Sequence, residues 1–335
     1  MLQFPEVSAG SIIMSFARHR VWIAALPILL ASCYPPERTT PPPAADASAK
    51  EVALAGAEVM IGAGDIGLCG SPGAKETGAI VDSILKADSA AKVENAVFTM
   101  GDNAYPSGSR GYSDIFNRCF RPSWGKPTIM KFIHPAPGNH DFENDAGPGY
   151  YKYFGARAGP PNQGYYSYDV GEWHVISLNS EILVDPVTPG DRKAEEDWLR
   201  EDLKAHQAKC TMAYFHRPLF TSGLHGPTPE VLGLWDILYE GGADLIVNGH
   251  DHHYERFLAQ TPDGVPDSLR GIEEIIVGTG GGVLRGVRNP LADNSAVQIH
   301  GYFGVLKLTL GAGEYRHAFL DTYGRVWDRG GRKCH

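Results

Sequence analysis

Several motifs that mark common enzyme classes are missing from this 335-residue sequence. It has no Gly-x-Ser-x-Gly nucleophile motif and no His-Glu-x-x-His zinc motif. The glycine-rich segment 278–282 is not followed by Gly-Lys-Ser/Thr, which excludes a phosphate-binding P-loop and favours a tight turn between strands. The sequence therefore gives no support to a serine hydrolase, a zinc protease of that type or a P-loop NTPase.

Basic residues are too few to balance the acidic ones. Lys and Arg number 30 against 39 Asp and Glu, for a formal charge of −9. A nucleic-acid-binding surface needs a basic footprint, so we expect none here. An acidic protein still binds anions locally where metal ions supply the positive charge. No internal repeat and no composition break follow residue 57, which predicts one catalytic domain over residues 58–335.

The N-terminus has the pattern of a secretory signal. Arg18 and Arg20 precede the apolar run 21–30, which is too short for a permanent membrane span of about 20 residues. Small residues follow this run, and together these features predict a signal peptide over residues 1–32. Met14 is a better start than Met1, because residues 1–13 contain no basic region.

Residues 30–33, Leu-Ala-Ser-Cys, resemble a bacterial lipobox, whose cysteine is lipidated and becomes the first mature residue. This resemblance predicts an exported lipoprotein, anchored to the outer membrane through a lipid on Cys33 and facing the periplasm or the cell exterior. Residues 33–57 are rich in proline and alanine, which predicts an extended tether. An ordinary signal peptide with a chance cysteine is the alternative.

The other four cysteines allow three disulfide connectivities, as expected for an exported protein. Cys69 and Cys119 both lie in loops after the first two predicted strands, at one end of the sheet. Cys210 immediately precedes a strand, which places it at the opposite end. Our hypothesis is the pairing Cys69–Cys119 and Cys210–Cys334, with four free buried thiols as the alternative.

The order of apolar runs and amphipathic stretches predicts an α/β fold. Apolar runs at 59–61, 96–100 and 128–136 read as strands, and helical spacing at Ile80, Val81, Ile84 and Leu85 predicts a helix between the first two. Such alternation predicts parallel pairing with right-handed crossovers. Further strands are expected at 165–169, 174–178, 211–215, 245–247, 274–277, 302–310, 315–320 and 325–328, and helices at 191–206 and from Thr228-Pro229 onward.

Five short segments place polar side chains at predicted strand ends. Four follow an apolar run, and the fifth closes one, so their side chains should gather in loops around one site. Oxygen donors mixed with imidazoles suit iron, zinc or manganese, and two such ions together hydrolyse phosphate esters. The candidate ligands are Asp65, Asp102, Tyr105, Asn139, His216, His250 and His252.

A nucleotide-binding alternative is not supported. Gly62-x-Gly64-x-x-Gly67 matches the dinucleotide fingerprint, but Asp65 lies inside it and would repel a pyrophosphate unless a metal intervened.

The ordered series of segments resembles the calcineurin-like metallophosphoesterases over residues 58–260. Within that superfamily, Tyr105 three residues after Asp102, the segment His216-Arg217-Pro218, and Gly249-His250 followed by 254–256 (Tyr-Glu-Arg) are similar to the purple acid phosphatases. This resemblance implies a four-layer α/β/β/α sandwich of two mixed β-sheets, with a dinuclear metal site at the carboxyl ends of the strands.

The same resemblance implies a role for each site residue. Fe(III) would be bound by Asp65, Asp102, Tyr105 and His252, and a divalent ion (Zn, Fe or Mn) by Asp102, Asn139, His216 and His250. His140 would contact the phosphate, and His225 would act as general acid toward the leaving group.

The implied activity is hydrolysis of small phosphate monoesters by a metal-activated hydroxide, as in an acid phosphatase. A phosphodiesterase built on the same metals is the alternative, and a non-catalytic protein that binds metal or phosphate is a third reading. Leu224 stands where plant members carry a histidine, and the additional N-terminal β-domain of plant members is absent, so the substrate stays open. The oligomeric state is also open.

Overall fold

The structure, a computed structural model, describes residues 54, 57–91, 93, 95–108, 114–142, 146–185 and 191–335. The expected signal peptide, the lipid-bearing Cys33 and nearly all of the expected tether lie outside the described residues. Within the described ranges, no helix combines the length and apolar character needed to cross a membrane.

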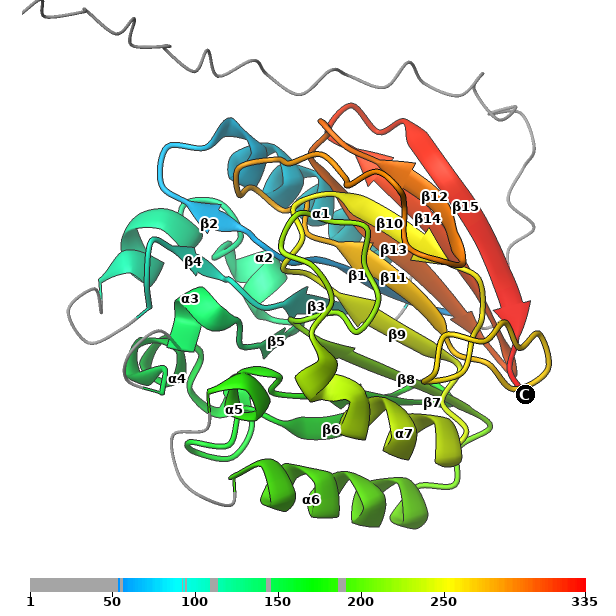
Figure 1. The fold of residues 1–335 in the computed structure, drawn as a ribbon. Helices are drawn as coiled ribbons and strands as arrows, with labels where there is room; N and C mark the ends of the chain where they lie inside the picture. The colour runs from blue at the N-terminus through cyan, green and yellow to red at the C-terminus, as the bar shows by residue number, and fades with distance from the viewer. Residues whose placement is uncertain are drawn as a thin grey trace, which may run out of the picture. The chain divides into compact units, whose positions relative to one another are not determined.

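The first sheet has six strands in the order β15-β14-β13-β1-β3-β5. The strands β1, β3 and β5 are parallel, whereas β13, β14 and β15 extend the sheet in antiparallel fashion from β1 (Figure 1). Their bounds are β1 Glu58–Ala63, β3 Asn95–Met100, β5 Ile133–Ala136, β13 Gly304–Gly311, β14 Glu314–Asp321 and β15 Val326–Lys333.

The second sheet has seven strands in the order β12-β10-β11-β9-β8-β7-β6. Its centre, β11-β9-β8-β7, is parallel, and both edges are antiparallel. The bounds are β6 Tyr166–Val170, β7 Trp173–Ser177, β8 Cys210–Phe215, β9 Leu245–Asn248, β10 Tyr254–Phe257, β11 Glu273–Val277 and β12 Ser295–Ile299. A small parallel pair, β2 (Gly67–Leu68) and β4 (Ala104–Tyr105), lies between loops.

The two sheets pack face to face around an aromatic core. Phe98 of β3 and Tyr214 of β8 have ring centroids 5.4 Å apart. Trp173 of β7 donates its indole N–H to the carbonyl oxygen of Gly311 in β13 at 3.0 Å. Because successive side chains of a strand face opposite ways, His174 points to the outer face, where it contacts Asp202 at 2.7 Å.

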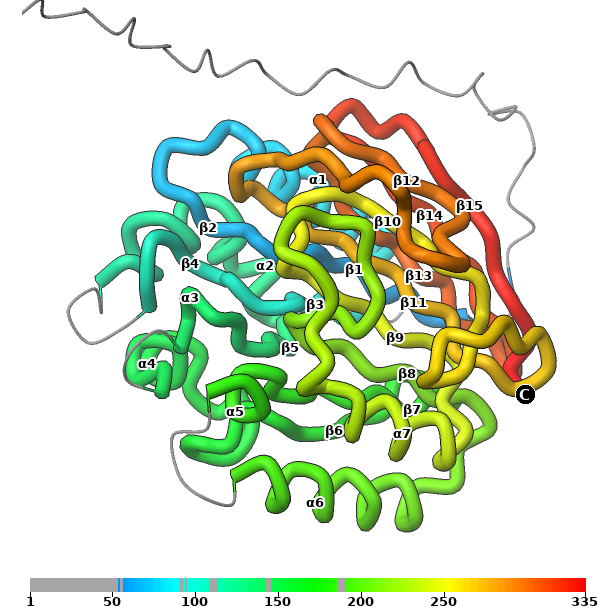
Figure 2. Tube along the Cα trace, viewed as in Figure 1, coloured from blue at the N-terminus to red at the C-terminus, as the bar shows by residue number. Residues whose placement is uncertain are grey.

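Helices cover the outer face of each sheet (Figure 2). Helix α1 (Pro72–Ala91) packs against the first sheet, with Gly73 close to the Phe303 ring. Helix α6 (Asp191–Ala205) carries Asp202 onto the second sheet, and α7 (Leu232–Glu240) packs beside α6. The expected four-layer α/β/β/α arrangement is therefore confirmed. The short helices are η2 Phe116–Phe120, α2 Pro127–Met130, α3 Asn139–Phe142, α4 Pro148–Phe154, η3 Gly155–Ala158, α5 Glu181–Val184 and η4 Pro229–Val231.

One expected strand is wrong over part of its length. Residues 128–130 belong to α2, and the strand begins only at Ile133. Pro127 occupies the first turn of this helix, where its fixed φ favours helix, and its carbonyl accepts a bond from the Lys131 N–H at 3.1 Å. The helix expected from Thr228 begins as the 3-10 turn η4, in which the Val231 N–H bonds to the Thr228 carbonyl.

Both expected disulfides are present. Cys69–Cys119 joins the loop after β2 to η2, and Cys210–Cys334 joins the start of β8 to the residue after β15. The second bridge therefore ties the two sheets together at the amino-terminal end of β8. Its 124-residue separation makes it a strong constraint on the unfolded chain.

Replacing both cysteines in Cys210→Ser/Cys334→Ser should lower the free energy of unfolding by roughly 2–4 kcal/mol, because the unfolded chain regains the entropy of a long open loop. Urea denaturation of the purified variant measures the loss. The pair lies at the end of β8 opposite His216, so bound metal should stay at the wild-type ratio. An unchanged denaturation midpoint would contradict the stabilising role of this bridge.

Candidate metal centre

Polar residues from both sheets meet at one edge, where parallel strands end. Asp65, Asp102 and Asn139 follow β1, β3 and β5 of the first sheet. His216 follows β8, and His250 follows β9, both in the second sheet. Carboxyl ends of parallel strands commonly form ligand sites, and here two sheets supply them together.

Three of these residues adopt a left-handed backbone, which non-glycine residues rarely do. The φ angles are 59° for Asp65, 49° for Asp102 and 70° for His250. Bonds between the loops hold them: the Asp65 N–H donates to the Gly101 carbonyl at 3.0 Å, and the His250 N–H donates to Asp65 Oδ2 at 2.8 Å. Strained backbone of this kind persists where surrounding contacts fix it, typically at functional sites.

One group of side chains surrounds the Tyr105 hydroxyl. Tyr105 Oη lies 2.9 Å from Asp65 Oδ1 and 3.0 Å from Asp102 Oδ2. It also lies 3.3 Å from His252 Nε2, which is itself 3.1 Å from Asp65 Oδ1. Four donor atoms from three connections, those after β1, β3 and β9, thus converge around the Tyr105 hydroxyl, in a buried location.

A second group surrounds the His216 imidazole. His216 Nε2 lies 3.1 Å from Asn139 Oδ1, 3.2 Å from His250 Nδ1 and 3.4 Å from Asp102 Oδ1. Asp102 therefore has one oxygen in each group. All seven residues expected from the sequence are brought together, in two sets that share this carboxylate.

Backbone carbonyls orient two of the imidazoles. His216 Nδ1 lies 2.8 Å from the Met100 carbonyl, and His252 Nδ1 lies 2.6 Å from the Val283 carbonyl. In a neutral ring with Nδ1–H donated to a carbonyl, each Nε2 would present its lone pair to a metal ion in the cluster. Metal-binding histidines are commonly held in this way.

Two glycines allow the loops to approach this closely. A Cβ atom at Gly138 would lie 2.4 Å from Asp102 Oδ1, and one at Gly249 would lie 2.8 Å from Asp65 Oδ2. Any larger residue at either position would displace a carboxylate, which explains the glycine in each segment.

The buried negative charge of Asp65 and Asp102 has no lysine or arginine partner in the described part of the chain. Among the described residues, Asp65 and Asp102 form ion pairs only with histidines. Burial alone would raise the pKa of Asp102, but His216 and His140 hold it well below its ordinary value. Burial lowers the pKa of His216, but the Asp102 and Asp65 carboxylates outweigh this effect and raise the pKa to about 10.

The two carboxylates thus favour the cationic form of the His216 imidazole. Two carboxylates, a phenol, an amide oxygen and three imidazoles form a donor set suited to iron, zinc or manganese, so the residues fit a pair of such ions. Asp65, Asp102 and His216 each offer one ligand atom within 4.8 Å of the others.

The cluster lies at the bottom of a cavity of about 480 Å³. His140 lines this cavity, and its Nδ1 lies 2.6 Å from the Pro106 carbonyl, which leaves Nε2 available to a ligand. His225 also lines it, with its ring centroid 4.5 Å from that of His250. The lining residues are Leu68, Tyr105, Asn139, His140, His225, His250, His252, Gly282, Val283 and Arg285.

Burial lowers the pKa of His225, and the Arg285 guanidinium lowers it further while Asp251 opposes the shift. Asp251 also fixes the loop, since its Oδ1 accepts the His225 N–H at 3.0 Å and its Oδ2 accepts the Thr221 hydroxyl at 2.7 Å. His253 points away from the cluster and pairs with Glu255 at 3.0 Å.

Three contributors to the site were not expected from the sequence. Asp141 accepts the N–H groups of Asn103 and Gly138, and so joins two of the ligand-bearing loops. Its place in the segment Gly-Asn-His-Asp was a usable signal. Arg285 and Val283 belong to a glycine-rich turn, and nothing in their local sequence indicates a pocket.

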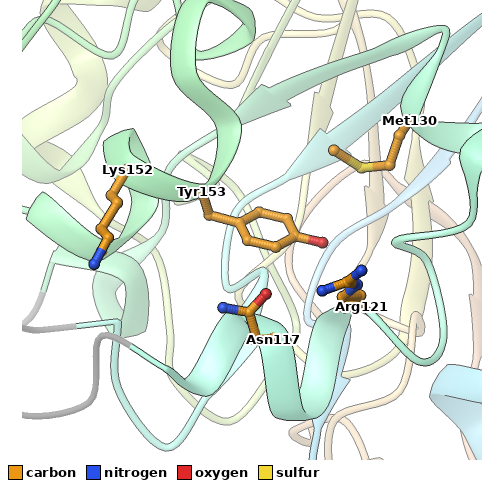
Figure 3. A pocket seen from close by; sticks show the side chains of 6 residues that line it. Asn117, Arg121, Met130, Lys152 and Tyr153 are labelled. Carbon is orange, nitrogen blue, oxygen red and sulfur yellow. The ribbon is translucent and has the colours of Figure 1, made fainter.

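A second cavity, of about 340 Å³, is lined by different chemistry (Figure 3). Asn117, Arg121, Met130, Lys152 and Tyr153 surround it, together with Gly149. It offers no carboxylate or imidazole, so it is not a candidate metal site.

His174, Asp202 and His206 form another cluster of potential ligands. The two imidazole rings stack at 4.5 Å with an interplanar angle of 13°, so one ion cannot lie in the plane of both. His174 instead lies between two carboxylates, the buried one of Asp202 and the exposed one of Asp169.

Comparison with known proteins identifies a matching protein family. The model of the calcineurin-like phosphoesterase family matches residues 61–254, more than half of the chain. Acid phosphatase type 7 of Mus musculus is 28% identical over 200 residues, covering 51% of this chain and 43% of its own length. Purple acid phosphatase 17 of Arabidopsis thaliana is 24% identical over 261 residues, covering 69% of this chain and 72% of its own length.

Solved structures share the fold. Purple acid phosphatase PPD1 from yellow lupin (Lupinus luteus) seeds superposes with a TM-score of 0.62 at 18% identity, over 83% of this chain and 54% of that one. GAP50, the anchor in the inner membrane complex of Plasmodium, superposes with a TM-score of 0.65 at 13% identity, over 83% of this chain and 89% of that one. The match to acid phosphatase type 7 spans less than half of that relative. On the family match and the shared fold, this chain belongs to the calcineurin-like phosphoesterase family.

Proposed function

We propose that this protein is a dinuclear-metal phosphomonoesterase of the acid-phosphatase type, acting on small phosphate esters. The observation that carries the proposal is the convergence of seven donor side chains in two sets that share Asp102, at the bottom of a cavity lined by His140 and His225. The similarity to proteins named acid phosphatase supports the same activity.

In this proposal, Asp65, Tyr105 and His252 would hold Fe(III), and Asn139, His216 and His250 would hold a divalent ion. Asp102 would serve both ions, because each of its oxygens faces one of the two groups. Such ions, when bound, activate water and neutralise charge on the phosphoryl oxygens.

His140 and His225 complete the proposed mechanism from the two sides of the cavity. The contact of His140 Nδ1 with the Pro106 carbonyl leaves Nε2 toward the cavity, where an Nε2–H group would donate to a phosphoryl oxygen. His225 donates a proton to the leaving alkoxide, and the bond from its backbone N–H to Asp251 keeps the loop in place.

We also propose that the protein is exported and lipid-anchored through Cys33, with residues 1–32 removed and residues 33–57 acting as a spacer to the catalytic domain 58–335. The two disulfides support export to an oxidising compartment. Lipid attachment rests on the motif at residues 30–33 alone.

Asp102→Asn should abolish activity and lower metal affinity by at least about 100-fold, because it removes the carboxylate shared by the two groups. Metal content by plasma mass spectrometry and turnover of an aryl phosphate measure the two effects. Asp263→Asn, an exposed acid elsewhere, is the control and should change neither. A folded Asp102→Asn variant that keeps its metals and its turnover would rule out the assigned centre.

Tyr105→Phe should remove any visible absorption band of the iron-loaded protein, because a phenyl ring has no oxygen to bind Fe(III). The fold should persist, since the ring still packs beside His140 at 4.6 Å. Tyr323→Phe, at a side chain 81% exposed, is the matched control and should retain the band. A band that survives in Tyr105→Phe would exclude this phenolate as the ligand.

The full chain, supplied with iron and zinc, should hydrolyse an aryl phosphomonoester faster than the matching bis-aryl diester. Preference for the diester would replace the proposed activity by a phosphodiesterase. Bound metal without turnover of either ester would support a non-catalytic binding protein.

A further inference from the structure

The segment 282–288, between β11 and β12, forms the rim of the cavity. Its backbone contacts two of the candidate ligands directly. The Gly282 N–H donates to the Asp65 carbonyl at 2.6 Å, the Val283 carbonyl lies 2.6 Å from His252 Nδ1, and the Arg285 N–H donates to the His252 carbonyl at 3.0 Å. The position of Arg285 is therefore fixed relative to the cluster.

The same segment is also attached to the loop that carries His225. The Arg288 N–H donates to the Ser222 carbonyl at 2.7 Å, and its guanidinium donates to the Thr221 carbonyl at 2.7 Å. Gly223 and Val287 form an isolated β-bridge. The rim segment thus joins the His225 loop to the cluster, with Arg285 between the two attachments.

Arg285 presents an unneutralised charge to the cavity. Within the described part of the chain, no carboxylate pairs with it, whereas Arg217 pairs with Glu181 at 2.9 Å and Arg256 with Asp328 at 2.7 Å. No aspartate or glutamate is among the residues that line the cavity. An exposed guanidinium facing a cavity is a preformed partner for an anion.

The surroundings of Arg285 indicate which anion. A guanidinium fits planar oxyanions through two parallel N–H bonds. Arg285 lies near His225, on the side proposed for the leaving group, and the apolar side chains of Leu68 and Val283 line the cavity beside it. Val283 is 63% exposed, so its surface is available to a ligand.

We propose that Arg285 selects phosphate monoesters whose leaving group carries a second oxyanion, a carboxylate or a phosphate, while Leu68 and Val283 contact its carbon skeleton. This inference rests on the proposed phosphomonoesterase function and names its substrate class. Arg285 is a specificity residue here and takes no part in proton transfer.

Binding of non-hydrolysable phosphonates to the metal-loaded full chain provides the direct test. Propylphosphonate is the reference ligand, and 3-phosphonopropionate and propane-1,3-diphosphonate add a carboxylate or a phosphonate at the far end. By calorimetry, each ligand with a second anionic group should bind more tightly than the reference. Arg285→Gln should reduce that advantage roughly 10- to 100-fold, as expected for a lost charge-assisted bond. The ligand with the larger loss identifies the preferred anion.

Turnover gives a second readout with a matched pair of substrates, glycerol 3-phosphate and 3-phosphoglycerate. The ratio of kcat/KM for 3-phosphoglycerate to kcat/KM for glycerol 3-phosphate should fall about 10-fold or more in Arg285→Gln. The fall should come mainly from a higher KM for 3-phosphoglycerate, and the ratio should recover partly in Arg285→Lys. Arg329→Gln is the control, because Arg329 is an exposed residue of β15 and is not among the cavity-lining groups; it should leave the ratio unchanged.

Equal weakening of all three phosphonates in Arg285→Gln would mean that Arg285 binds the shared phosphoryl group, and would overturn the proposal. A wild-type protein that shows no preference for the ligands with a second anionic group would overturn it as well. If the wild type cleaves glycerol 3-phosphate but the ratio is insensitive to Arg285, only this inference fails. No turnover of any monoester, by contrast, would reject the proposed function itself and this inference with it.

Discussion

The site depends on one constraint, two buried carboxylates close to each other that pair with no lysine or arginine among the residues the structure describes. Asp65 and Asp102 share the Tyr105 hydroxyl and accept backbone N–H bonds from His250 and His140. Isolated buried charges are costly, so this arrangement requires protons or cations. The surrounding imidazoles can carry protons, and a pair of metal ions would supply cations. Left-handed backbone, close glycines and carbonyl-oriented histidines all serve to keep these groups together.

Several other buried charges in the described part of the chain are balanced by a direct partner. Arg256 pairs with Asp328, and His253 pairs with Glu255. His174 is held between two carboxylates on the outer face of the second sheet. These pairs have no cavity beside them among those described, and their geometry needs no further ion. The contrast separates charges that maintain the fold from those that face a ligand.

The sequence pattern predicted the strand–helix alternation and the seven clustered side chains, because their segments follow or close apolar runs and parallel strands end at a common edge. The four layers were implied by the resemblance to the metallophosphoesterases. The sequence pattern was wrong at residues 128–130, where apolar side chains suit a strand but Pro127 begins a helical turn. It also did not identify β12, whose exposed edge has no continuous apolar run. The cavity role of Arg285 was not predictable, since hydrogen bonds to segments distant in sequence fix its position.

The site draws its groups from both sheets, and this connects ligand binding to folding. Asp65 and His252 are 187 positions apart in the chain, yet they contact each other at 3.1 Å. A metal held there recognises only the docked sheets, so its binding free energy adds to the stability of the folded state. At a free concentration of 100 times Kd, this linkage is worth about 2.7 kcal/mol. The complete set of candidate ligands therefore exists only when both sheets are in place.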